Sequence, residues 1–406
     1  MRRWWMSGLL GAAVILLAAT ASAGPDRDWS ASVAIDAPDA LADQPVHIRL
    51  YGIPAGRAVT VRLTAAAYDR SQWRSQALFT ADGTGTVDLD RAASLGGTYS
   101  GVDGMGLFSS LVPPAGDPDR VQFLPLFPEA AASYEVKLTV WDGRRAAGGR
   151  VLHRIWTGAG VTHQVLTPGG DGLDGVYFAP PATAHGVAVL AFGGSEGGNG
   201  EKYTAALLAS HGVPALALAY FARPGLPGAL RDVPLEYFDR AITRLHELSG
   251  LPVVLLGFSR GTEAALLSAE AFPRWVRGIV AYAPTDTVHA GYPSGAEAWT
   301  LHAAPVSPGT RLKAVVPLLA IAGDADGLWP SAAAALALGG SGARVLIYPG
   351  AGHLVGTFPY LPAGVRPTHP LTGAELDMGG SRAGDAAARR DGWPRVLAFL
   401  GAPTAP

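Results

Sequence analysis

The stretch at residues 252–267 reads PVVLLGFSRGTEAALL and combines three signals that together decide the fold of this part of the chain. Residues 252–257 form an apolar run, which predicts a β-strand buried on both faces of a sheet. Gly257-Phe258-Ser259-Arg260-Gly261 then fits G-x-S-x-G, the nucleophile elbow. Its turn is so sharp that the residues two positions before and after the serine must lack side chains. A helix is expected at 263–272. Strand, tight turn and helix in this order are typical of a parallel sheet with helices on both faces.

The same alternation of strand and helix extends from about residue 167 toward the end of the chain. The expected strands are apolar runs at 187–192, 214–219, 276–283, 315–322 and 343–348, and the expected helices span 202–211 and 235–249. Near-continuous apolar strands with crossover helices predict a doubly wound, mostly parallel sheet, and so few strands argue against a closed barrel.

Residues 29–157 have a different pattern, in which apolar and polar residues alternate. Strands are expected at 32–35, 46–50, 59–63, 77–80, 86–89 and 134–140, separated by Gly, Pro and Asp turn signals. Short strands at this spacing predict an all-β, antiparallel sandwich of immunoglobulin-like type. The Gly- and Pro-rich segment at 96–117 is expected to form a long loop.

The first residues have the composition of an export signal. Met1-Arg2-Arg3 is cationic, residues 9–19 (LLGAAVILLAA) are apolar, and Ala21-Ser22-Ala23 matches a small-x-small cleavage site. We therefore expect a signal peptide at residues 1–23 and a periplasmic or secreted protein with no stable membrane insertion after cleavage. The alternative is an uncleaved anchor, since residues 4–24 are uncharged and just long enough to span a membrane.

Charge and composition exclude several classes of function. The 406 residues carry 31 Lys+Arg and 33 Asp+Glu, a net charge of -2, whereas nucleic-acid binding needs a basic surface. The chain has no cysteine, which removes disulfides, thiolate metal sites and a cysteine nucleophile. No H-E-x-x-H motif or histidine pair at ligand spacing occurs beside the elbow, so neither a metal nor another cofactor is expected.

Two serines match G-x-S-x-G, and their contexts distinguish them. Ser259 lies between an expected strand and an expected helix, so we expect it to be the nucleophile; the alternative is a structural serine in a tight turn. Ser195 lies in the glycine-rich loop 193–200 (GGSEGGNG), directly after another expected strand. Through Gly194 or Ser195, this loop is expected to give one backbone N–H to the oxyanion hole, and Arg260 the other. The alternative is that the loop is only a connector.

A serine nucleophile needs a histidine to take its proton and a carboxylate to hold that histidine. In this architecture each partner is expected in a turn just after a later strand. Asp326 follows the strand at 315–322 and is the expected acid, with Asp324 as the alternative. His353 is the expected histidine, because among the histidines after Ser259 it alone lies in a glycine-flanked turn directly after a strand.

These motifs, with further runs along the chain, resemble the acyl-CoA thioesterases and bile acid-CoA:amino acid N-acyltransferase. The resemblance covers nearly the whole chain after residue 23 and rests on runs at 40–46 (ALADQPV), 73–77 (WRSQA), 99–108 (YSGVDGMGLF), 218–221 (LAYF), 225–227 (GLP), 234–238 (PLEYF), 326–331 (DGLWPS) and 350–353 (GAGH). It implies a β-sandwich at 24–165, an α/β-hydrolase domain at 166–406, and a triad of nucleophile, acid and histidine at Ser259, Asp326 and His353.

The resemblance implies a serine hydrolase acting on acyl thioesters such as acyl-CoA, with a small-molecule thioester or ester as substrate. In one departure, the acyltransferase branch has cysteine where this chain has Ser259, and an acyl-serine ester suits attack by water. In the other, an exported enzyme would rarely meet acyl-CoA. An exported carboxylesterase or acyltransferase acting on a non-CoA acyl group therefore stays open, as does a non-catalytic binding protein on this scaffold. The sequence does not determine the oligomeric state.

Overall fold

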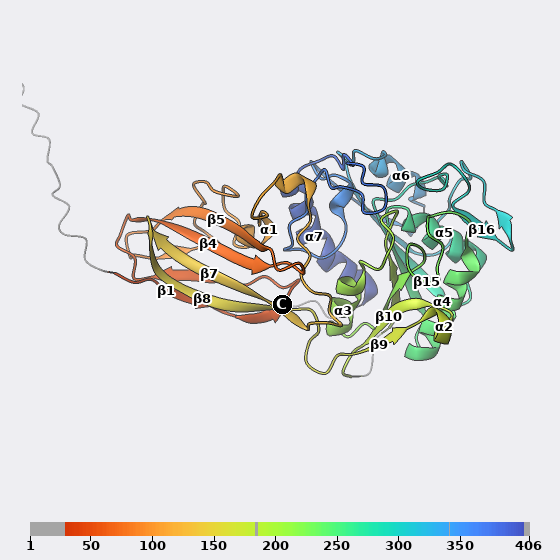
Figure 1. Ribbon diagram of the computed structural model, residues 1–406, viewed down its shortest axis with the longest axis horizontal. Coiled ribbons are helices and arrows are strands. Elements are labelled where there is room, and N and C mark those ends of the chain that lie inside the picture. The colour runs from red at the N-terminus through yellow and green to blue at the C-terminus, as the bar shows by residue number, and fades with distance from the viewer. Residues whose placement is uncertain (1–28, 183–185, 341, 402–406) are drawn as a thin grey trace, which may run out of the picture.

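The computed structural model describes residues 29–182, 186–340 and 342–401. The signal peptide expected at 1–23 lies outside these residues. The described chain forms an all-β part followed by an α/β part, and the two lie side by side along the long axis of the molecule (Figure 1).

The all-β part consists of two sheets, one of five strands in the order β2-β8-β7-β4-β5 and one of three in the order β1-β3-β6. The strands pair antiparallel, except that β2 lies parallel to β8. Buried and exposed side chains alternate along β4, β5 and β7, as the sequence does. The immunoglobulin-like type stays a prediction. The strands are β1 (Ser32–Ile35), β2 (Asp39–Leu41), β3 (Ile48–Tyr51), β4 (Ala58–Ala66), β5 (Gln72–Thr80), β6 (Val87–Asp88), β7 (Ser133–Asp142) and β8 (Arg145–Ile155).

The α/β part is built on an eight-stranded sheet of order β19-β18-β15-β14-β11-β12-β10-β9. From β19 to β12 the strands are parallel, whereas β10 pairs antiparallel with both β12 and β9. The predicted mostly parallel sheet is confirmed, and every residue of β11 and β12 is buried. The strands are β9 (Thr162–Leu166), β10 (Asp174–Ala179), β11 (Ala188–Phe192), β12 (Ala215–Ala219), β14 (Val253–Phe258), β15 (Val276–Tyr282), β18 (Leu318–Gly323) and β19 (Arg344–Tyr348).

The sequence pattern does not predict β9 and β10. β9 is an edge strand whose residues are exposed except Leu166, so it lacks the apolar run that marks the central strands. Because β9 begins at Thr162, the second sheet starts a few residues before residue 166, where the sequence analysis places the domain boundary.

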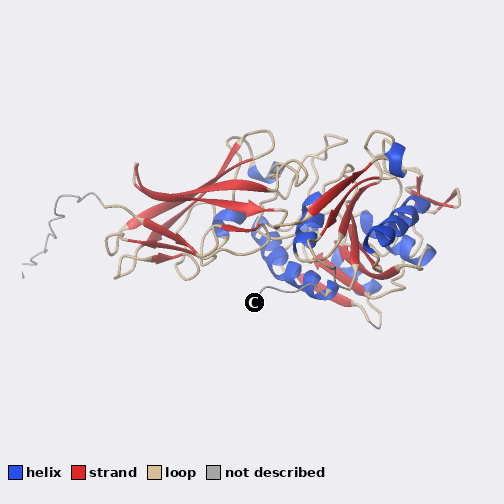
Figure 2. Ribbon diagram, turned by 90° about the horizontal axis from the view of Figure 1, so that it is seen from below, coloured by secondary structure: helices blue, strands red, loops and turns tan. Residues whose placement is uncertain are grey.

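Helices flank the sheet (Figure 2). The longest, α7, is not predicted from the sequence, because Gly392 and Pro394 within it are signals of a turn. The helices are α1 (Gly106–Ser109), which lies in the segment expected to be a loop, α2 (Pro168–Asp171), α3 (Lys202–Ser210), α4 (Leu235–Ser249), α5 (Gly261–Ala271), α6 (Ser331–Leu338) and α7 (Arg382–Leu400). Short elements complete the fold: the 3₁₀ turns η1 (Pro118–Arg120) and η2 (His353–Val355), and a small sheet of β13 (Val233–Pro234), β16 (Trp299–Leu301) and β17 (Ala304–Pro305).

The two parts share an apolar core. One cluster of buried residues runs from the all-β sheets into the α/β part. Trp156 lies at this junction, with its ring centroid 4.7 Å from that of Tyr203 in α3 and 5.5 Å from that of Phe358. Helix α7 also lies at the junction (Figure 1), and Trp393 Nε1 donates to the buried carboxylate of Asp43 at 2.6 Å. The all-β part is therefore packed into the α/β part rather than tethered to it.

Candidate active site

The elbow at residues 257–261 joins β14 to α5 and presents Ser259 at the carboxyl edge of the parallel sheet. Ser259 has a φ of 56°, in the left-handed region that is costly for a residue with a side chain. A Cβ atom on Gly257 would lie 2.6 Å from the Gly261 carbonyl oxygen, and one on Gly261 would strike the Gly193 carbonyl oxygen. The close approach of three backbone segments therefore requires both glycines of the motif.

Ser259 meets a histidine and an aspartate from turns that follow two other strands. Ser259 Oγ donates to His353 Nε2 at 2.8 Å, and His353 Nδ1–H donates to Asp326 Oδ2 at 2.9 Å. Asp326 follows β18, and His353 begins η2 after β19. The side chains of His353 and Asp326 are each 1% exposed. The structure thus brings together the three residues that the sequence analysis names as nucleophile, histidine and acid.

Asp326 and its alternative, Asp324, have different partners. Asp326 Oδ1 accepts hydrogen bonds from two backbone N–H groups of the following turn, at 2.9 and 3.3 Å, which directs Oδ2 toward His353. Burial alone would raise the pKa of Asp326, but the hydrogen bonds that it accepts outweigh burial and hold its pKa below the ordinary value. Asp324 instead accepts the backbone N–H of Gly350 at 2.7 Å, so it stabilises the turn before His353.

Aromatic side chains fix the ring of His353. The Trp329 ring stands edge-on to it with centroids 4.7 Å apart, and the Phe258 ring lies 5.3 Å away. Trp329 is itself anchored, because its Nε1 donates to the carbonyl oxygens of Ala283 at 3.3 Å and Pro284 at 3.0 Å. The imidazole is therefore held by contacts with two aromatic rings as well as by hydrogen bonds at both nitrogens.

A buried carboxylate lies beneath the elbow. Glu263, in the first turn of α5, is fully buried and accepts Arg260 Nε at 2.7 Å, Trp299 Nε1 at 2.7 Å and His289 Nδ1 at 2.9 Å. The Arg260 guanidinium is consequently committed to Glu263 and to the carbonyl oxygen of His289, which it meets at 3.0 Å. Sequence reasoning missed this network; its one signal is a charged residue, Glu263, in an otherwise apolar helix start.

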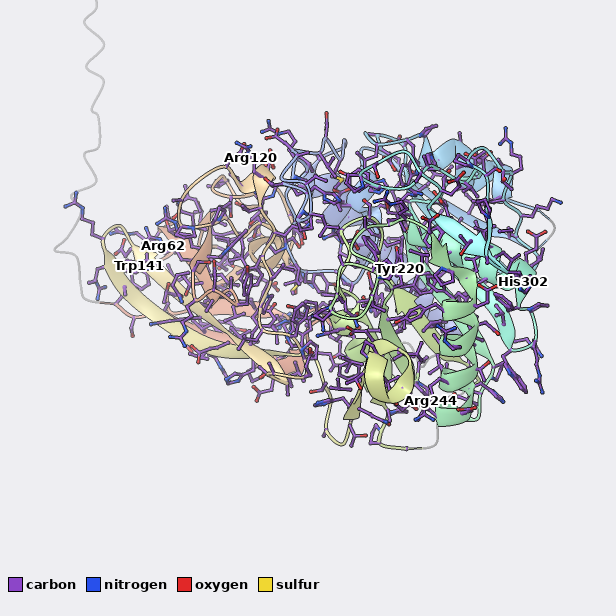
Figure 3. The ribbon with its side chains drawn as sticks, turned by 45° about the vertical axis from the view of Figure 1, so that its right-hand side comes forward. Arg62, Arg120, Trp141, Tyr220, Arg244 and His302 are labelled. Carbon is purple, nitrogen blue, oxygen red and sulfur yellow. The ribbon has the colours of Figure 1, made fainter. Side chains whose placement is uncertain are left out.

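The loop after β11 packs directly against the nucleophile. A Cβ atom on Gly194 would lie 2.7 Å from Ser259 Cβ, so glycine is required for this contact. The Tyr220 hydroxyl, at the end of β12 in the interior of the α/β part (Figure 3), is within 2.9 Å of the carbonyl oxygens of both Gly193 and Gly194. The Gly194 N–H donates to Glu196 Oε1 at 2.8 Å. Hydrogen bonds from Tyr220 and within the loop therefore hold this turn against the elbow.

The backbone N–H groups expected to form the oxyanion hole differ in their availability. Within the part of the chain that the structure describes, the N–H groups of Arg260 and Ser195 have no hydrogen-bond partner. The N–H of Gly194 is already bound to Glu196. Of the two loop residues that the sequence analysis offers, Ser195 is therefore the one with a free donor.

A second histidine, His369, reaches the same loop from the segment before α7. Its Nε2 lies 3.4 Å from Ser195 Oγ, and its ring is 4.7 Å from that of Tyr292. Its Nδ1 accepts the backbone N–H of Leu371 at 3.2 Å, so Nε2 carries the proton. Burial lowers the pKa of His369, which favours this neutral form. The sequence does not single out this histidine, since it follows no expected strand.

Two further kinds of site are not found among the described residues. No group of three or more His, Asp and Glu side chains within ranges 29–182, 186–340 and 342–401 is placed to hold a metal ion. In the same ranges, no helix is both long and apolar enough to cross a membrane.

Two family models match the chain. Residues 43–168 match the acyl-CoA thioester hydrolase/BAAT N-terminal region, and residues 311–405 match the BAAT/acyl-CoA thioester hydrolase C-terminal region. The chain belongs to this family, and it is an enzyme of the acyl-CoA thioester hydrolase kind. Asp326 and His353 lie inside the second match, whereas Ser259 lies between the two. The assignment of the nucleophile therefore depends on the geometry of the elbow.

Relatives of known name align with this chain over most of its length and most of their own. Acyl-coenzyme A amino acid N-acyltransferase 1 of Mus musculus is 29% identical over 405 residues, covering 89% of this chain and 95% of the relative. Acyl-coenzyme A thioesterase 6 of Homo sapiens is 27% identical over 404 residues, covering 88% and 93%. Among solved structures, TT1662 from Thermus thermophilus aligns with a TM-score of 0.36 at 19% identity, covering 60% of this chain and 99% of that one.

Proposed function

We propose that the protein hydrolyses acyl thioesters by forming a covalent acyl ester on Ser259, with His353 as the general base and Asp326 as the acid that orients it. The observation that carries this proposal is the unbroken series of hydrogen bonds from Ser259 Oγ through His353 to Asp326, at 2.8 and 2.9 Å. A serine hydroxyl is a poor nucleophile until a neighbouring base takes its proton, and this geometry supplies that base.

The residues have distinct tasks in the two half-reactions. In acylation, His353 Nε2 takes the Ser259 proton as Oγ attacks the thioester carbonyl carbon, and it then protonates the leaving thiolate. In deacylation, His353 takes a proton from water, the resulting hydroxide attacks the acyl ester, and the proton returns to Ser259 Oγ. The products are a carboxylic acid and a thiol. Asp326 keeps the proton on Nδ1 throughout and stabilises the imidazolium.

The negative charge on the former carbonyl oxygen needs fixed donors. We assign the backbone N–H groups of Arg260, which follows Ser259, and of Ser195, which follows the Gly194 that packs against Ser259. Neither N–H group has another partner among the described residues. Both donors are main-chain groups, so their position depends on the elbow and the loop rather than on side-chain identity.

Hydrolysis rather than acyl transfer is favoured by the nucleophile. Relatives of this chain carry both thioesterase and N-acyltransferase names. The sequence contains no cysteine, so any intermediate at the elbow is an oxygen ester of Ser259. An acyl-serine ester suits attack by water, whereas an acyl thioester is attacked more readily by an amine.

A second candidate function follows from the N-terminal segment. We propose residues 1–23 as a signal peptide, on the observation of the apolar run at 9–19 followed by Ala21-Ser22-Ala23. Export to the periplasm or the medium would separate the enzyme from coenzyme A. The same three residues would then act on an oxygen ester or another non-CoA acyl group.

One set of assays tests both candidates. The mature protein, from residue 24, is given an acyl-CoA, a p-nitrophenyl ester and a lactone of matched chain length. We expect the thioester to be cleaved fastest, and intact-mass spectrometry to show an acyl adduct that is absent from Ser259→Ala. A higher kcat/KM for the oxygen esters would favour the second candidate.

Ser195→Ala is the matched control, because it changes the other G-x-S-x-G serine and keeps its backbone N–H. It should retain labelling by a fluorophosphonate probe, whereas Ser259→Ala should lose labelling while its circular dichroism spectrum stays unchanged. Labelling retained in Ser259→Ala and lost in Ser195→Ala would reverse the assignment.

A further inference from the structure

Glu196 occupies an unusual place for a carboxyl group, directly over the turn that faces the nucleophile. Its side chain folds back along the loop, so that Oε1 accepts the Gly194 N–H at 2.8 Å. A Cβ atom on Gly194 would lie 3.0 Å from Glu196 Oε2 and 3.1 Å from Ser259 Oγ. Glu196 Oε2 and Ser259 Oγ therefore both border Gly194 and lie no more than about 6 Å apart.

No cation is paired with this carboxyl group. Among the described residues, no Lys, Arg or His forms an ion pair with Glu196, and the neighbouring Arg260 guanidinium is committed to Glu263. The titratable groups facing this region are Glu201 at the start of α3, Tyr220 at the end of β12, Arg260 and Glu263 at the start of α5, His353 in η2, and His369 near Ser195. Burial raises the pKa of Glu196 to about 7, and Glu201 adds to this rise.

We propose that Glu196 is a positioning residue for the hydrolysis: its carboxyl group holds the 193–195 turn so that the Ser195 N–H rather than the Gly194 N–H points into the oxyanion hole. This proposal depends on the function proposed above for Ser259. It assigns a task to a side chain that takes no part in the transfer of protons between Ser259, His353 and Asp326.

Two contacts support the role of Glu196 in positioning the 193–195 turn. First, the Gly194 N–H is bound to Glu196, so it is not available to the carbonyl oxygen of the substrate. Second, the Tyr220 hydroxyl donates to the carbonyl oxygens of Gly193 and Gly194 and so fixes the other side of the turn. The same closeness explains why the neutral form is required. An ionised carboxylate beside the oxyanion hole would oppose the negative charge that develops there, so the carboxyl group acts in its neutral form.

Two substitutions of Glu196 distinguish the length of its side chain from its ability to ionise. Glu196→Gln keeps an oxygen within reach of the Gly194 N–H and cannot ionise, whereas Glu196→Asp keeps an ionisable carboxyl group and is shorter by one methylene. At pH 6 we expect Glu196→Gln to have nearly the wild-type kcat, and Glu196→Asp to lose about 10²-fold in kcat with little change in KM, as for a misplaced active-site group. Binding of a trifluoromethyl ketone, which forms an oxyanion on the serine, should weaken by the same factor as kcat.

The pH dependence gives a second measurement that does not depend on the folding of Glu196→Asp. The neutral form of Glu196 is populated below its raised pKa and lost above it. The ratio of kcat/KM for Glu196→Gln to that of wild type, in which titrations common to both enzymes cancel, should therefore rise as pH increases through about 7. A ratio that stays flat from pH 6 to 8, or a Glu196→Gln enzyme as impaired as Glu196→Asp, would overturn the proposal.

Two controls keep this result distinct from a failure of the proposed function. Glu201→Gln neutralises the neighbouring buried acid without touching the 193–195 turn, and its kcat at pH 6 should be close to wild type. Turnover that survives in Ser259→Ala would disprove the proposed function itself, whatever the Glu196 variants show.

Discussion

The two aspartates in the turn after β18 have different hydrogen-bond partners and therefore different roles. Asp326 faces His353 at 2.9 Å, whereas Asp324 accepts the Gly350 N–H at 2.7 Å. Asn at the true acid cannot hold the histidine in the required tautomer, so Asp326→Asn should lower kcat by about 10⁴-fold. Steady-state kinetics of the purified variant measures this loss.

Asp324→Asn is the matched control for this prediction. Its amide oxygen can still accept the Gly350 N–H, so turnover should stay near the wild-type level. A crippled Asp324→Asn enzyme together with a nearly normal Asp326→Asn enzyme would exchange the two roles.

The sequence locates the residues at strand ends better than the residues that support them. Ser259, Asp326 and His353 each follow an apolar strand, and the carboxyl ends of parallel strands meet at one edge, so their proximity is predictable. Glu263 and His369 instead make contacts between segments that are far apart in the sequence. His369 reaches Ser195 across 174 positions of sequence, and no local pattern marks that contact.

At the scale of elements, α5 is the helix on which the elbow depends. Its first turn carries Glu263, which accepts hydrogen bonds from Arg260, Trp299 and His289. Glu263→Ala leaves a buried guanidinium without its partner, so the free energy of unfolding should fall by about 3–5 kcal/mol. Urea denaturation followed by circular dichroism measures the change.

Glu270 lies on the same helix and is exposed. Glu270→Ala should change the free energy of unfolding by less than about 0.5 kcal/mol, as expected for an isolated surface position. Equal losses in the two variants would mean that the buried network contributes nothing beyond ordinary helix stability.

The elements themselves were predictable where one rule applied to the whole segment. The central parallel strands are apolar throughout, because both faces of the sheet are covered, and the sequence alone identifies them. Edge strand β9 is mostly exposed, so it lacks the apolar run of a central strand. Helix α7 contains Gly392 and Pro394, which are signals of a turn rather than of a helix. Trp393 and Val396 of α7 are nonetheless buried, since packing against the sheet and the all-β part outweighs local preference.

At the scale of the whole molecule, the all-β part is held to the α/β part by a shared core and by one buried carboxylate. Asp43, next to β2, accepts Trp393 Nε1 from α7 and His211 Nε2 from the end of α3, each at 2.6 Å. Its side chain is 1% exposed. The two contacts join residues that are 168 and 350 positions apart in the sequence. They therefore connect the all-β part directly to the α/β part.

Asp43→Ala should therefore destabilise both parts together. It leaves the Trp393 and His211 donors without an acceptor in a buried place, and each unsatisfied buried group costs about 1–3 kcal/mol. In urea we expect a single unfolding transition, at a lower midpoint than wild type, that coincides in tryptophan fluorescence and far-ultraviolet circular dichroism. Asp39→Ala is the control, because it breaks an exposed pair with His153 at 2.8 Å and should cost less than about 1 kcal/mol. Two separate transitions, with only one of them shifted by Asp43→Ala, would show that the all-β and α/β parts unfold independently despite their common core.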